Sequence, residues 1–60
     1  MTVSQADAFL GLAKELRDLY NWFLGLYPED ARQLPPISNM TIEQLVSQRA
    51  IMLRLKAARQ

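Results

Sequence analysis

The sequence predicts an all-α protein, an antiparallel helical hairpin that dimerises into a four-helix bundle. Three observations carry this prediction: an apolar heptad seam in the first half of the chain, a connector that contains prolines, and a capping signal that opens a second helix. Sixty residues form one small domain, 1–60, and a core of this size supplies little stability unless a disulfide, a metal or self-association adds to it.

The first helix is expected at about 5–27. A capping box at Ser4, or alternatively at Thr2, opens it, and Pro28 ends it because proline lacks a backbone N–H. Its apolar face is wider than one partner helix requires. The seam, together with three residues of the second helix, is assigned to the core and to self-association: Phe9, Leu12, Leu16, Leu19, Phe23, Leu26, Leu45, Met52 and Leu53.

The connector is expected at 28–40 and should begin with a short helical turn, because a proline followed by two acids suits a first turn of helix. The two expected long helices differ in length: at 1.5 Å per residue the first is about 34 Å long and the second about 25 Å. We therefore expect Leu34 and Ile37 to fold back against the aromatic end of the first helix.

The second helix is expected at about 42–58, with Thr41 as N-cap and Gln44 completing a capping box. Its predicted core face is broad and comprises Ile42, Leu45, Val46, Ala50, Met52, Leu53 and Ala57. Ile51 and Leu55 lie on the opposite side, beside Gln44 and Gln48, as two separate solvent-facing residues or as a second contact strip.

Charged residues interrupt the predicted core face of the second helix at Arg49 and Lys56. For Arg49 one interpretation is a pair with Glu15 or Asp18 on the first helix, since buried charges are normally paired. The other is an ion pair with an acidic group on a bound partner.

The candidate partner-binding residues are Tyr20, Trp22, Tyr27, Arg49 and Arg54. Aromatic side chains bury much area at little entropic cost and are enriched in binding hot spots, although they also fill small cores. Trp22 lies off the central seam, so we expect its ring to stay partly exposed in the free protein.

Composition excludes several kinds of chemistry. The chain has no cysteine and no histidine, which removes disulfides, the usual zinc ligands and imidazole acid–base catalysis. We expect no cofactor, no metal and no enzymatic activity. A cytoplasmic location fits the lack of cysteine, and neither a signal peptide nor a membrane-spanning stretch is expected.

The sequence favours a small non-enzymatic protein-interaction module, a regulator, inhibitor or assembly adaptor that docks helical faces onto a larger partner protein and onto a second copy. Small phage or plasmid proteins often have this profile. The plan is similar in outline to the plasmid copy-number protein Rop, a small hairpin dimer, although the connector here is longer and Rop's RNA-contacting positions have no match. The alternative is a Rop-like homodimer that binds RNA through Arg54, Lys56 and Arg59. Membrane binding is less favoured because polar residues interrupt the second helix.

Overall fold

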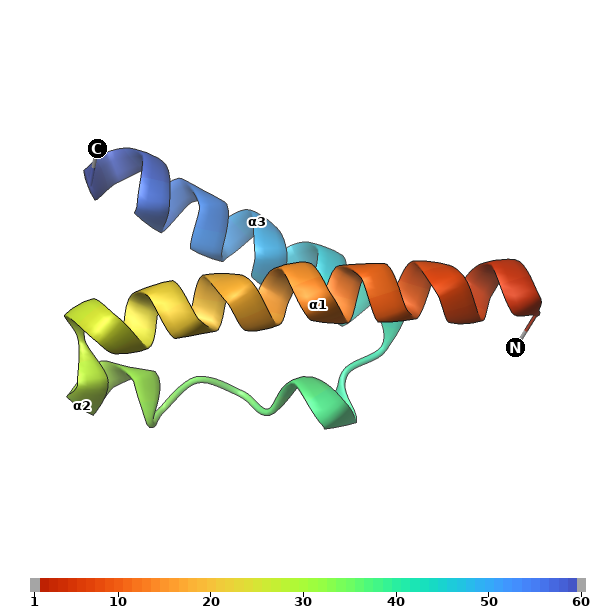
Figure 1. Cartoon of the computed structure of the whole chain (residues 1–60), viewed down its shortest axis with the longest axis horizontal. Coiled ribbons are helices and arrows are strands. Elements are labelled where there is room, and N and C mark those ends of the chain that lie inside the picture. The colour runs from red at the N-terminus through yellow and green to blue at the C-terminus, as the bar shows by residue number, and fades with distance from the viewer. Residues whose placement is uncertain (1, 60) are drawn as a thin grey trace.

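The computed structural model describes residues 2–59, which form two long helices and two short helical turns (Figure 1). The long helices are α1, Val3–Leu26, and α3, Ile42–Arg59. Between them lie α2, Pro28–Ala31, and the 3-10 turn η1, Ile37–Asn39. The described part of the chain contains no strand, which confirms the predicted all-helical class.

Local signals set the ends of these helices. At the start of α1 the Thr2 hydroxyl accepts from the backbone N–H of Gln5 at 3.1 Å, while the Thr2 N–H donates to the Gln5 side chain at 2.9 Å. Of the two expected capping boxes, the one at Thr2 therefore forms, and α1 begins at Val3, earlier than expected. Its last residue is Leu26, because Pro28 follows within two residues.

The start of α3 confirms the second predicted capping box. The Gln44 N–H donates to the Thr41 hydroxyl at 3.2 Å, and the Thr41 N–H donates to the Gln44 side-chain oxygen at 2.8 Å. The short helix α2 opens on Pro28 with two acids in its first turn, so the predicted helical turn in the connector is also confirmed.

The two long helices run in the same direction, and the expected antiparallel orientation is wrong. Arg49 pairs with Glu15, Lys56 lies over the ring of Trp22, and Arg59 lies over the ring of Tyr27. Residue numbers thus increase together along both helices. Figure 1 shows the connector returning along α1 before α3 begins beside the N-terminal half of α1.

The length of the connector explains this parallel arrangement. An antiparallel hairpin needs a loop of only about 2–5 residues. Residues 32–41 can span up to about 33 Å when extended, which is close to the ~36 Å length of the 24-residue helix α1. The connector can therefore carry the chain back along α1. As expected, Leu34 and Ile37 fold back and pack against the core.

The core lies between α1, α3 and the returning connector. Its buried residues are Ala13, Leu16, Leu19, Leu45 and Met52. Phe9, Leu12 and Phe23 from the predicted seam are half-buried against this cluster. Two other residues of the predicted core set, Leu26 and Leu53, are 53% and 48% exposed in the single chain.

The broad core face predicted for α3 is narrower in the structure. Leu45 and Met52 are fully buried, whereas Val46 and Leu53 are largely exposed. In an α-helix successive residues are rotated by about 100°, so the neighbour of a residue that points at α1 points sideways. The connector covers one side of α1 and α3 covers the other. Only a narrow face of α3 is therefore buried against α1.

Candidate interaction surface

The aromatic residues near the end of α1 form one cluster centred on Phe23. The ring centroid of Phe23 is 6.2 Å from that of Trp22 and 5.2 Å from that of Tyr27, with tilted planes in both pairs. Trp22 directly precedes Phe23 on α1, and Tyr27 is the C-cap residue just after α1, four positions after Phe23. Trp22 is half-buried, in agreement with its expected partial exposure.

Two cations of α3 cover this aromatic cluster. The Lys56 ammonium lies 5.8 Å from the centroid of the Trp22 ring, and the Arg59 guanidinium lies 4.7 Å from the centroid of the Tyr27 ring. Both distances are within the range of cation–π attraction. The sequence did not predict these contacts, because the pairing of the end of α3 with the end of α1 follows only from their parallel direction.

An open cleft of about 230 Å³ lies beside the aromatic cluster. It is lined by Trp22, Phe23, Tyr27, Asp30, Leu55 and Arg59. The cleft brings together α1, α2 and α3, and it contains two of the predicted partner-binding residues. At about 230 Å³ the cleft is smaller than the roughly 300–1,000 Å³ typical of small-molecule pockets.

Tyr20 is separate from this cluster. Its hydroxyl donates to the backbone oxygen of Pro35 at 2.9 Å, so the side chain fastens the returning connector to α1. Burial raises the pKa of Tyr20, and the side chain of Gln48 lowers it by less. The predicted group of Tyr20, Trp22 and Tyr27 is thus divided, with Tyr20 in a structural position.

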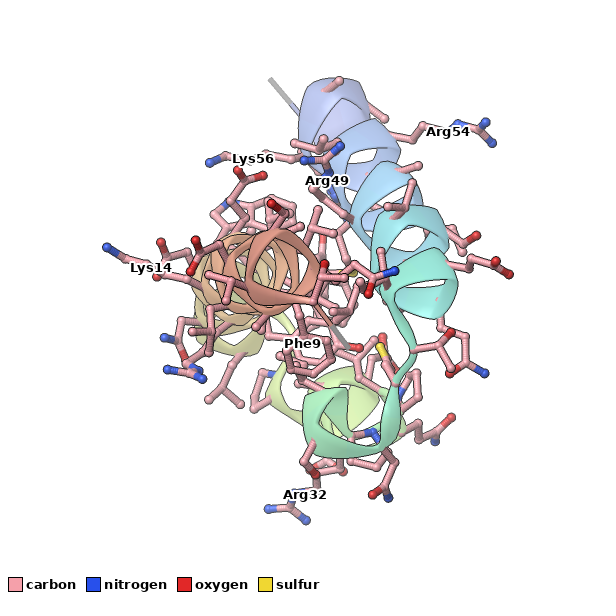
Figure 2. All side chains as sticks on the ribbon, turned by 90° about the vertical axis from the view of Figure 1, so that its right-hand side faces the viewer. Phe9, Lys14, Arg32, Arg49, Arg54 and Lys56 are labelled. Carbon is pink, nitrogen blue, oxygen red and sulfur yellow. The ribbon has the colours of Figure 1, made fainter. Side chains whose placement is uncertain are left out.

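Arg49 is also engaged within the chain. Its Nη1 atom donates to the Glu15 carboxylate at 2.9 Å, and the two side chains are 33% and 60% exposed. The predicted ion pair with Glu15 is therefore confirmed. Arg54 behaves differently: it is exposed and extends from α3 on the side opposite Lys56 (Figure 2).

Exposed apolar side chains flank the α1-facing line of α3 on both sides. Val46 and Leu53 lie on one flank, at 43% and 48% exposure. Ile51 and Leu55 lie on the other flank and are similarly exposed, and Leu55 also lines the cleft. On α1, Val3, Leu10, Leu24 and Leu26 are also exposed.

Other kinds of site are not found in residues 2–59. No group of three or more acidic, histidine or cysteine side chains is placed to hold a metal ion. Neither long helix contains an apolar stretch sufficient to cross a bilayer. Comparison with known protein families, with curated proteins and with solved structures finds no match to this chain. The class that the fold and its surface define is a small helical protein with exposed apolar helix faces.

Proposed function

We propose that this protein is a non-enzymatic interaction module, a regulator, inhibitor or assembly adaptor, that acts by binding other proteins through the exposed faces of its helices. The observation that carries this proposal is the exposure of apolar side chains on both flanks of α3. Large apolar side chains scattered singly over a surface are ordinary, but adjacent ones mark interaction sites.

The total surface area supports the proposal. The chain exposes 4526 Å². A compact monomer of 6.9 kDa exposes about 4,000 Å². The excess of about 500 Å² is a substantial part of the roughly 800 Å² that one partner contributes to a standard protein interface. Covering this surface would bury apolar area that the small core leaves in water.

In the dimeric four-helix bundle expected from the sequence, a second copy would cover these faces. A larger partner protein would cover the same faces by presenting a helix or a groove of its own. Both forms belong to the proposed function. They differ in the charges that the occupant must present.

No specific observation favours the nucleic-acid alternative. The three cations that it requires do not share one surface, because Lys56 and Arg59 lie over aromatic rings of α1 whereas Arg54 extends away from α1. Phosphate binding by a helix normally uses cations that face one groove or backbone together.

Affinity capture with the full chain tests the proposed function. The tagged chain is incubated with lysate of its source organism, with and without nuclease, and bound proteins are quantified by mass spectrometry. We expect one protein partner to be retained by the wild type and lost with the double variant Leu53→Gln/Leu55→Gln, which makes both flanks of α3 polar. The variant Lys14→Gln, at an exposed position of α1, is the matched control and should retain the partner.

Two results would contradict the proposal. One is that no protein is enriched over the tag alone and the chain stays monomeric at all concentrations. The other is that binding is abolished by nuclease and falls steeply with salt, which would indicate phosphate contacts instead.

A further inference from the structure

One flank of α3 has the spacing of a coiled-coil seam. It consists of Val46, Ala50, Leu53 and Ala57, here called the α3 strip, at successive spacings of four, three and four residues. All four residues are exposed. This spacing keeps side chains on one face of a helix and is the pattern that packs against a second helix. The strip spans about 17 Å at 1.5 Å per residue, so its occupant is a helix of about three turns.

Both edges of the α3 strip carry positive charge. Arg49 and Lys56 follow one edge, seven residues apart, and Arg54 lies on the other edge. Figure 2 shows Arg54 and Lys56 extending to opposite sides of α3, with the helix between them. The Glu15 carboxylate neutralises the charge of Arg49. The Trp22 ring carries no charge, so the positive charge of Lys56 is not neutralised by its contact with that ring. The single acid of α3 is Glu43, at its first turn.

A second copy of the chain fits the α3 strip poorly. Two α3 strips packed together would place Arg54 and Lys56 of each copy beside cations of the other. The exposed apolar residues Val3, Leu10 and Leu24 on α1 have heptad spacing as well, but Arg17 occupies the intervening heptad position. Pairing that surface with α3 would set Arg17, at the centre of the contact, against the cations of α3, which costs affinity.

We infer that the α3 strip binds an amphipathic helix of another protein whose own apolar seam is edged by glutamate or aspartate. This inference rests on the proposed function and specifies its partner. The strip supplies the apolar contact, and the cations on its two edges select an acidic occupant and reject a basic one. The contact is small, so the complex belongs to the weaker, transient class of interfaces.

Two designed peptides test the inference with the full chain. Each is a labelled three-heptad helix with leucine at both seam positions; one has glutamate at every flanking position and the other has lysine. Like charges keep each peptide from pairing with itself. Binding is followed by fluorescence anisotropy at 0.1 M and 1 M NaCl, where the screening lengths are about 10 Å and about 3 Å.

Leu53→Gln and Ile51→Gln are the matched variants. Both side chains are 48% exposed in the wild type and lie two residues apart, but only Leu53 belongs to the α3 strip. We expect the glutamate peptide to bind at least ten-fold more tightly than the lysine peptide at 0.1 M NaCl, with the difference shrinking at 1 M. Leu53→Gln should weaken binding of the glutamate peptide at least ten-fold and Ile51→Gln less than two-fold. Arg54→Gln should weaken it several-fold.

Three results would overturn the inference. Equal binding of the two peptides, or no binding of either, would contradict an acid-edged helix as the occupant of the α3 strip. Equal effects of Leu53→Gln and Ile51→Gln move the site to another face of α3. If sedimentation equilibrium shows a wild-type dimer and a monomeric Leu53→Gln variant, the occupant is a second copy. This last result leaves the proposed function standing. A wild-type monomer that captures nothing from lysate contradicts both this inference and the proposed function.

Discussion

Met52 and Leu53 are neighbours on α3 with opposite surroundings, and truncating each to alanine tests which face of that helix is buried. Met52 is fully buried and Leu53 is 48% exposed. Removing a fully buried side chain of this size costs the free energy of transferring its atoms from water and leaves a cavity, which together destabilise a protein by about 2–5 kcal/mol. For Leu53 about half of the transfer term applies and no enclosed cavity forms, so we expect about 1 kcal/mol or less.

The assay is urea unfolding followed by circular dichroism at 222 nm, at a protein concentration low enough to keep the chain monomeric. Because a core of this size supplies only about 3–5 kcal/mol, Met52→Ala should be largely unfolded even without urea, whereas Leu53→Ala should keep a clear transition. Met52→Leu is the folded control for the position, since a volume-conserving exchange costs less than about 1.5 kcal/mol.

Equal losses for the two alanine variants would refute the narrow buried face of α3. A larger loss for Leu53→Ala than for Met52→Ala would restore the broad core face predicted from the sequence. A loss at Leu53 that grows with protein concentration would show instead that a second copy covers this side chain.

Three further predictions concern α1 and its contacts. Tyr20→Phe removes the hydrogen bond to the connector and should cost about 1 kcal/mol at pH 7. Because burial raises the pKa of Tyr20, the folded state holds its proton more tightly than the unfolded state. Stability from this group is constant below pH 10 and falls as the pH rises above it, a decline that Tyr20→Phe should reduce. A double-mutant cycle of Glu15→Ala and Arg49→Ala should give a coupling of about 0.2–1 kcal/mol, because the pair is partly exposed; zero coupling would contradict the contact. Gly25→Ala should stabilise the chain by about 0.5–1 kcal/mol in thermal unfolding, since an added methyl group meets nothing within 4 Å, and any loss of stability would contradict the open environment.

The candidate site could be predicted only in part. Glu15 was one of the two acids of the first helix expected to pair with Arg49, because a cation at the centre of an apolar face needs a nearby acid. Spacing alone could not separate Tyr20 from Trp22 and Tyr27, because the Tyr20 side chain binds the returning connector at Pro35. The cation–π contacts of Lys56 and Arg59 join residues more than 30 positions apart, and no local pattern pairs them.

The sequence by itself determined the helices. Thr41 with Gln44 starts α3, and Pro28 ends α1 and opens α2, because capping and proline geometry act over only a few residues. The tertiary structure alone decided the direction of α3, which depends on the path of the connector. The tertiary structure also decided which face of α3 meets α1, because local sequence does not fix the rotation of a helix about its axis: Met52 lies in the core and Leu53 on the surface that we propose to be the binding site.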